Sequence, residues 1–180
     1  MSHWTLSLAQ LRRCVPDIFK PGNCLYIGAS RDKFAHGATE MLRAGRKIAI
    51  LEIWEPNVDY YRRRKEIASV ILGDVRHIVD MKLPHFDVAF WWHGPEHIKR
   101  EELAKTLAGI EAISNLVVLG CPFGYTEQRD EEMRGNPHQV HLSGFLPKDF
   151  ETLGYRVDTF GQEGGWNTSN ILAWKRRGTK

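Results

Sequence analysis

Short apolar runs, separated by stretches with helical spacing, constrain how this chain folds more than any other feature. Seven segments have the composition of strands, and they lie at residues 24–27, 48–51, 69–72, 87–92, 115–119, 155–160 and 170–174. Apolar residues recur at helical spacing between them, for example over residues 34–44 and 96–113. Strands that are continuously apolar and alternate with helices are typical of a parallel sheet covered on two faces.

The two ends of the chain complete this prediction. Only residues 161–169 join the last two strands, and a parallel crossover needs a dozen or more residues, so these strands should be antiparallel. Helical spacing within residues 1–20 predicts an N-terminal helix that covers the sheet edge. We therefore expect a single α/β domain over residues 1–180, with a doubly wound, mostly parallel seven-stranded sheet, a C-terminal antiparallel strand and helices on both faces.

The composition, with 42% hydrophobic and 26% charged residues, indicates a soluble globular protein. A net charge of +3 is too small to predict nucleic-acid binding, and no apolar run approaches the about 20 residues of a membrane span. The first residues lack the plan of a signal peptide, and three scattered cysteines fit neither a disulfide framework nor paired zinc ligands. We expect a cytoplasmic protein without a nucleic-acid or membrane partner.

Glycine and acidic residues follow three successive strands, at the edge of the sheet where ligands bind in such folds. Gly28 follows the first strand, Glu52 ends the second strand 24 residues later, and Asp74 follows the third. A carboxylate about 20 residues past a glycine turn is where a ribose diol is held in nucleotide-binding folds. The other interpretation of Glu52 is a solvated side chain at a strand end, but apolar Leu51 and Ile53 flank it.

Residues 121–147 form a stretch of 27 residues without a strand pattern. Structureless stretches longer than about 12–15 residues are uncommon in compact domains and are usually functional. We predict a short helix near residues 127–133, another helix that begins at Pro147, and an active-site role for the whole stretch.

Several motifs resemble those of the class I S-adenosylmethionine-dependent methyltransferases. The similar segments are residues 25–30, 50–55, 73–75 and 86–97. Residues 136–141 resemble a late segment of the small-molecule branch of that family. The likeness extends over nearly the whole chain, from about Asn23 to Arg176.

The resemblance implies S-adenosylmethionine as the cofactor and methyl transfer to an oxygen or nitrogen of a small molecule. Gly28 would approach the methionine part of the cofactor, Glu52 would bind both ribose hydroxyls, and Asp74 would accept a hydrogen bond from the adenine amino group. The full set of implied cofactor-binding residues is Gly28, Ala29, Ser30, Glu52, Ile53, Asp74, Val75 and Trp91.

The first motif departs from the family pattern, which usually carries three glycines. Only Gly28 is present, and Ser30 and Asp32 occupy the other two positions. A cofactor-binding protein without turnover is therefore one alternative. An NAD-dependent oxidoreductase is another, although the chain lacks G-x-G-x-x-G and is short for a separate substrate domain.

Histidines lie where the resemblance places the methyl acceptor. Methyl transfer requires alignment of nucleophile and methyl group, and a base where the nucleophile is protonated. We assign this catalytic role to His93, His97 and His141. Residues 93–97 also match the H-x-x-E-H signature of metalloproteases, but their internal Gly-Pro excludes the continuous helix that this signature requires.

A metal site is the open alternative for the same histidines. Some class I enzymes carry E-x-x-E-H at this point and a further histidine later, and here Glu96 and His97 match while His93 replaces the first acid. His138 or His141 would be the later ligand. Because mixed clusters of histidine and carboxylate often arise without a metal, we expect no metal at this site.

Overall fold

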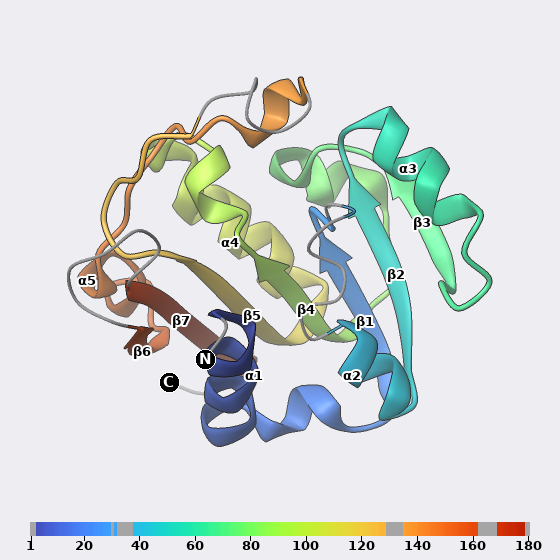
Figure 1. Ribbon diagram of the computed structural model, residues 1–180, viewed down its shortest axis with the longest axis horizontal. Coiled ribbons are helices and arrows are strands. Elements are labelled where there is room, and N and C mark those ends of the chain that lie inside the picture. Colours follow the sequence, from blue (N-terminus) through green and yellow to red (C-terminus); the bar gives the residue numbers. More distant parts are fainter. Residues whose placement is uncertain (1–2, 30, 32–37, 129–134, 162–168, 179–180) are drawn as a thin grey trace.

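A computed structural model describes residues 3–29, 31, 38–128, 135–161 and 169–178. Its centre is a seven-stranded sheet with the strand order β3-β2-β1-β4-β5-β7-β6 (Figure 1). The strands are β1 (Gly22–Ile27), β2 (Arg46–Glu52), β3 (Ser69–Leu72), β4 (Phe86–Trp92), β5 (Ser114–Pro122), β6 (Arg156–Gly161) and β7 (Ser169–Arg176). Strands β1 to β5 pair in parallel, and β7 is antiparallel to both β5 and β6. The predicted sheet and its reversed C-terminal strand are confirmed.

The central strands are buried on both faces, as their continuous apolar sequences predict. Successive side chains of a strand point to opposite faces, so each strand contributes to two separate cores. In β1, Ile27 belongs to one core and Tyr26 to the other; in β4, Trp91 and Trp92 divide in the same way.

Helices cover both faces of the sheet, as predicted (Figure 1). They are α1 (His3–Cys14), α2 (Ala38–Arg43), α3 (Glu55–Arg62), α4 (Leu103–Ala112) and α5 (Pro147–Glu151). Leu11 of α1, Met41 of α2 and Tyr61 of α3 pack in the core that contains Tyr26. Leu107 of α4 and Phe150 of α5 pack in the opposite core.

Residues 1–20 were expected to cover the sheet edge. Helix α1 and a 3-10 helix at Pro16–Phe19 occupy most of this range. The side-chain amide of Gln10 donates to Asp158 of the edge strand β6 at 2.7 Å. The apolar side of the same region, with Leu11 and Ile18, packs on the face of the sheet. The N-terminal region therefore contacts both the edge and one face.

The single helix predicted over residues 96–113 is wrong in its first part. Helix α4 begins at Leu103, and two separate 3-10 turns precede it at Pro95–His97 and Arg100–Glu102. Ile98 and Lys99 between these turns have extended backbone angles. The carbonyl of Glu96 accepts hydrogen bonds from the backbone nitrogens of Leu142 and Ser143 instead of from the next helical turn. Tertiary contacts thus interrupt the helical pattern.

Other helix boundaries differ less from the prediction. Helix α3 ends at Arg62, and α5 begins at Pro147 as expected. A 3-10 helix at Val75–Met81 was not predicted; the Asp74 carboxylate caps it by accepting from the Arg76 backbone nitrogen at 2.9 Å. Most of the helix predicted near 127–133 lies outside the described residues. In the described part of the chain, no helix is long and apolar enough to cross a membrane.

Parallel pairing brings the carboxyl ends of four strands to one edge of the sheet. Ile27 at the end of β1 pairs with Leu51 of β2 on one side and with Trp91 of β4 on the other. Glu52 pairs with Leu72 at the end of β3. Strand β5 extends to Pro122, so the first residues of the segment predicted to lack strand are part of the sheet. We call residues 123–146, between β5 and α5, the late segment.

Candidate functional site

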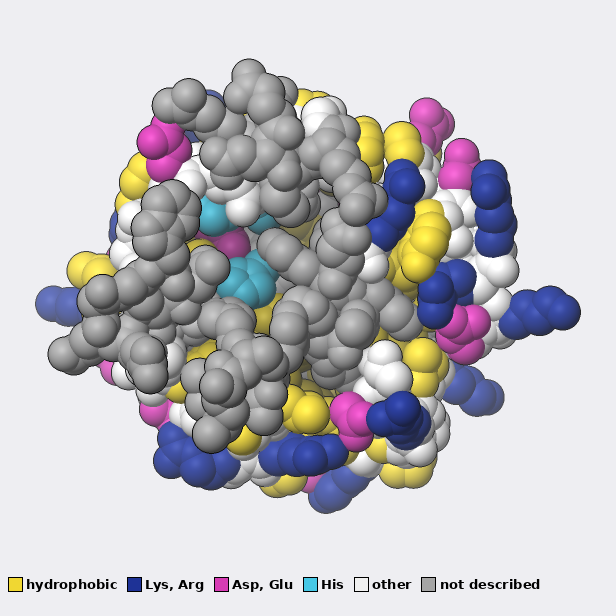
Figure 2. Space-filling model, viewed as in Figure 1, with side chains coloured by type: hydrophobic (Ala, Val, Ile, Leu, Met, Phe, Trp, Pro, Cys, Tyr) yellow, Lys and Arg dark blue, Asp and Glu magenta, His cyan; other side chains and the backbone are white. Residues whose placement is uncertain are grey.

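A pocket of about 780 Å³, its open mouth included, lies at the carboxyl ends of β1 to β4. Strand ends form one side of it, and the late segment forms the other. Its lining includes most of the residues predicted for the cofactor, namely Gly28, Glu52, Ile53, Asp74, Val75 and Trp91, together with His93, His97 and His138. Figure 2 shows histidine and acidic side chains gathered at one place on the face that it displays.

Gly28 has the conformation that a close backbone approach requires. Its φ of +66° lies in the left-handed region, and among the described residues no atom beyond its chain neighbours lies within 4 Å of a Cβ added there. The backbone therefore borders open space in the pocket. Ala29, also predicted to bind the cofactor, is instead fully buried in the core on the other face, because the chain turns away after Gly28. Ser30 lies outside the described residues.

Glu52 is a buried carboxylate fixed by several donors. Glu52 is only 4% exposed. Its Oε1 accepts hydrogen bonds from the backbone nitrogens of Ile53 at 3.0 Å and Trp54 at 3.1 Å. Burial raises the pKa of this carboxyl, and hydrogen bonds from Trp54, Asn57 and Ile53 oppose that rise without cancelling it. The carboxylate is thereby held in one orientation at the pocket wall.

Arg31 and Asn57 support Glu52, and sequence reasoning missed both. Arg31 Nε donates to Asn57 Oδ1 at 3.0 Å, and the guanidinium lies over the rings of Trp54 and Tyr60. With its oxygen engaged by Arg31, the Asn57 amide uses its nitrogen for the hydrogen bond to Glu52. The available signal was the position of Asn57 in the first turn of the helix that follows Glu52.

Asp74 lines the pocket, as predicted, but it already has a strong partner. Both of its oxygens accept from the Arg76 guanidinium, with Nη2 at 2.6 Å from Oδ2 and Nε at 3.0 Å from Oδ1. Burial raises the pKa of the Asp74 carboxyl, but the hydrogen bonds from Arg76 outweigh it and the net pKa is lowered. Arg76 also contacts Glu102 at 3.2 Å. A ligand at Asp74 would therefore share this carboxylate with Arg76.

His93 immediately follows β4 in an unusual backbone conformation. Its φ is +50°, and few residues other than glycine adopt the left-handed region. The backbone nitrogen donates to the Gly120 carbonyl at 2.8 Å, and ring Nδ1 lies 3.1 Å from Glu96 Oε1. Sparsely populated conformations of this kind cluster at functional sites.

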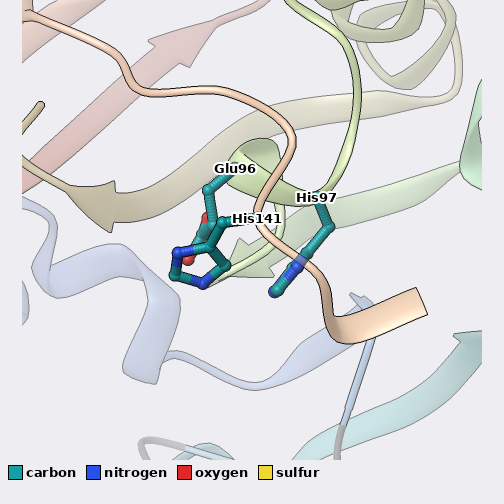
Figure 3. A group of neighbouring side chains, drawn as sticks. All are labelled: Glu96, His97 and His141. Carbon is teal, nitrogen blue, oxygen red and sulfur yellow. The ribbon is translucent and has the colours of Figure 1, made fainter. Parts of the chain in front are cut away.

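His97 and His141 lie together beside Glu96 (Figure 3). The two imidazole centroids are 4.9 Å apart, and one ligand atom from each of the three residues lies within 4.8 Å of the others. His138, the other late histidine considered, lines the pocket and is not part of this group. The structure thus selects His141 from the two alternatives. It also brings the three histidines assigned a catalytic role to one end of the pocket, since His93 contacts Glu96.

Backbone hydrogen bonds hold the late segment against the turn after β4. The nitrogens of Leu142 and Ser143 donate to the Glu96 carbonyl at 2.8 and 3.1 Å. The Ser143 hydroxyl donates to the Ile98 carbonyl at 2.8 Å. These bonds fix His141 relative to Glu96 and His97. Cys121 nearby is fully buried, and burial raises the pKa of its thiol well above the ordinary value, so it is a core residue rather than a nucleophile.

The sequence matches no protein-family model and no curated protein. Its structure is similar to that of a putative zinc-dependent alcohol dehydrogenase from Rhodobacter sphaeroides, with a TM-score of 0.67 at 14% identity over 97% of this chain and 93% of that chain. It is similar to the N-methyltransferase NodS from Bradyrhizobium japonicum WM9, with a TM-score of 0.61 at 15% identity over 93% and 92% of the two chains.

A third similar structure is that of magnesium protoporphyrin IX methyltransferase from Synechocystis PCC 6803 with bound SAH, with a TM-score of 0.63 at 11% identity over 96% and 82% of the two chains. Most of the similar structures are those of S-adenosylmethionine-dependent methyltransferases. This chain has the α/β fold of those methyltransferases. At such identities the likeness concerns the fold, and the activity has to be argued from the site.

Proposed function

We propose that this protein transfers a methyl group from S-adenosylmethionine to an oxygen or nitrogen of a small molecule. The observation that carries the proposal is Glu52, a buried carboxylate at the pocket wall, with the open backbone of Gly28 one strand away. A fixed carboxylate can accept from both hydroxyls of a ribose, and such charge-assisted bonds are stronger than neutral ones. This hydrogen-bond acceptor therefore fits the ribose of an adenosyl group.

The remaining pocket residues fit the other parts of that group. Ile53 and Val75 offer apolar contacts beside Asp74, as an adenine ring with its amino group requires. Gly28 leaves room for the methionine part next to Trp91. When bound, S-adenosylmethionine supplies a sulfonium-activated methyl group. The chain's own contribution is to orient the two reactants and exclude water around them.

The histidine end of the pocket would receive the methyl acceptor. His93 and His97 line it, and His141 packs against His97. Imidazoles next to a buried carboxylate can polarise or deprotonate a hydroxyl or amine. The absence of Asn/Asp-Pro-Pro-Tyr after β4 argues against amines of nucleobases.

Methyl transfer to a small molecule and cofactor binding without turnover give different results in one labelling experiment. The full-length protein is incubated with methyl-labelled S-adenosylmethionine and a small-molecule extract, with Glu52→Ala as the matched control. We expect label in small-molecule products with the wild type and strongly reduced label with the variant. Binding of the cofactor without any transfer of label would favour the alternative of a binding protein without turnover. In a parallel incubation with a macromolecular extract, transfer of label to macromolecules and not to small molecules would contradict the proposed acceptor class.

The oxidoreductase alternative has one observation in its favour, the likeness to a structure described as a putative alcohol dehydrogenase. The turn after β1 contains Gly28 but not the G-x-G-x-x-G that brings a helix N-terminus to a dinucleotide pyrophosphate. Nicotinamide-dependent oxidation of alcohols in the same extract would be required to support it.

A further inference from the structure

Glu96, His97 and His141 point to the same space from two distant parts of the chain (Figure 3). Glu96 and His97 lie in the 3-10 turn after β4, and His141 lies in the late segment. We propose that these three side chains bind a divalent transition-metal ion, with zinc as the representative, and that the site discriminates against Mg²⁺. This reverses our expectation of no metal at this site, because the fold assembles a ligand set that the sequence left incomplete.

The hydrogen bonds of the two imidazoles favour the tautomer that binds a metal. His97 Nδ1 lies 3.1 Å from the Val140 carbonyl, and His141 Nδ1 lies 2.5 Å from the Thr126 carbonyl. A carbonyl oxygen can only accept, so each Nδ1 carries the hydrogen, and in the neutral ring the lone pair is on Nε2. A ring nitrogen bonded to a backbone carbonyl in this way is the usual companion of a metal-bound imidazole.

Burial at this end of the pocket gives an electrostatic reason for a bound cation. The exposed fraction is 2% for Glu96 and 8% for His141. An ionised carboxylate at such depth is stable only beside positive charge and hydrogen-bond donors. His93 supplies one donor, since its Nδ1 lies 3.1 Å from Glu96 Oε1. We assign His93 a positioning role, holding the carboxylate toward the two other ligands.

The donor set determines which ion fits. Two imidazoles and one carboxylate are typical ligands of zinc and other first-row transition metals, and three protein ligands leave a position open for water or substrate. Mg²⁺ prefers oxygen ligands in octahedral geometry, which this set does not provide.

Backbone hydrogen bonds hold the ligands near one another before any ion binds. Leu142 and Ser143 donate to the Glu96 carbonyl, which joins the two segments that carry the ligands. His97 also lines the pocket, so an ion there would face the space proposed for the acceptor. An open metal position can bind an acceptor oxygen and lower its pKa. Only this last role rests on the proposed methyl transfer; binding of the ion does not.

Metal titration of the untagged, chelator-treated full chain tests the site without cofactor or acceptor. We expect one Zn²⁺ or Co²⁺ per chain, and Mg²⁺ binding weaker by roughly 100-fold or more. His141→Ala and Glu96→Gln should weaken Zn²⁺ binding by roughly 100-fold or more, because loss of even an outer partner costs about 10–100-fold. His138→Ala, which removes a pocket histidine outside the group, is the matched control and should bind as the wild type does.

Two further measurements keep the result interpretable. Glu96→Gln preserves the shape of the side chain, so it covers the case in which His141→Ala fails to fold. His93→Ala should weaken Co²⁺ binding by about 10–100-fold while the visible absorption of the bound ion keeps its form, as expected of a positioning residue. Absence of Zn²⁺ and Co²⁺ binding by the wild type, equal affinity for Mg²⁺, or an equal loss in His138→Ala would overturn the proposal.

Discussion

The two ends of the pocket are built in different ways. At the β1–β3 end, Gly28 directly follows β1, Glu52 closes β2 and Asp74 lies two residues after β3, so the parallel register brings them to one edge. At the histidine end, Glu96 and His97 lie in a 3-10 turn, and His141 reaches them only because the late segment bonds to that turn. The first end depends on the sheet, and the second depends on tertiary contacts of a loop.

This difference predicts that the two ends respond independently to substitution. A change at the β1–β3 end should affect nucleotide binding and leave the histidine group intact. A change at His141 or Ser143, which lie in the late segment outside the pocket lining, should affect the histidine group and leave nucleotide binding intact.

Glu52→Ala should weaken binding of S-adenosylhomocysteine by about 2–4 kcal/mol, because a charged acceptor shared by two hydroxyls is lost. Isothermal titration calorimetry measures this change directly. His141→Ala is the partner experiment at the other end of the pocket and should bind S-adenosylhomocysteine as the wild type does. Equal weakening in both variants would show that the two ends are not independent.

Ser143→Ala should lower the free energy of unfolding by about 1–3 kcal/mol, because the buried Ile98 carbonyl loses its donor. Chemical denaturation followed by circular dichroism measures the loss. Thr152→Ala removes an exposed hydroxyl that donates to the Asp149 carbonyl and should change stability little. The affinity of Ser143→Ala for S-adenosylhomocysteine should remain that of the wild type; a parallel loss of affinity contradicts the separation of the two ends.

Asn57→Ala should weaken binding of S-adenosylhomocysteine about tenfold, or about 1.4 kcal/mol, because Glu52 loses the donor that orients it. A positioning role has a distinct signature in a double-mutant cycle. In the Glu52→Ala background the same substitution should have almost no further effect. Additive losses would mean that Asn57 acts on the ligand by another route. Asn115→Ala, which removes an exposed amide in contact with His85, is the matched control.

Glu52→Gln should change the pH dependence of stability in the ligand-free protein. Burial raises the pKa of this carboxyl in the folded state, so its ionisation opposes folding. The cost is absent below the unfolded-state pKa, grows as the pH rises toward the folded-state pKa, and is complete above it. In neutral buffer the variant should therefore be more stable than the wild type, with a smaller difference in acid. Denaturation midpoints at several pH values measure this, and a difference independent of pH would contradict the burial argument.

The sequence predicted the β1–β3 end better than the histidine end, for a physical reason. Apolar runs define strands, and the residue after each strand has a known place in a parallel sheet, so Gly28, Glu52 and Asp74 could be located. The side chain of Ala29 lies in the core on the opposite face, because the chain turns one residue after Gly28. Arg31 and Arg76 act through side-chain contacts that no local pattern encodes, and the signal for Asn57 was its place in the first turn of α3.

At the histidine end, local patterns were insufficient. In the sequence, the helical spacing of residues 103–110 continues back to residue 96. In the structure, the hydrogen bonds from the late segment to the Glu96 carbonyl interrupt that helix. The choice between His138 and His141 depended on the path of the late segment, which has no periodic pattern. Proximity of Glu96, His97 and His141 is therefore a result that only the folded chain provides.

The most direct test of the account is a calorimetric titration of the wild-type protein with S-adenosylhomocysteine, with NAD as the comparison ligand. We predict one S-adenosylhomocysteine per chain and no binding of NAD. At about 100 times the dissociation constant, the ligand should stabilise the protein by about 2.7 kcal/mol and raise its melting temperature by roughly 5–10 °C. No heat and no melting shift at millimolar S-adenosylhomocysteine, or binding of NAD in its place, would contradict the claim that this pocket holds the methyl donor.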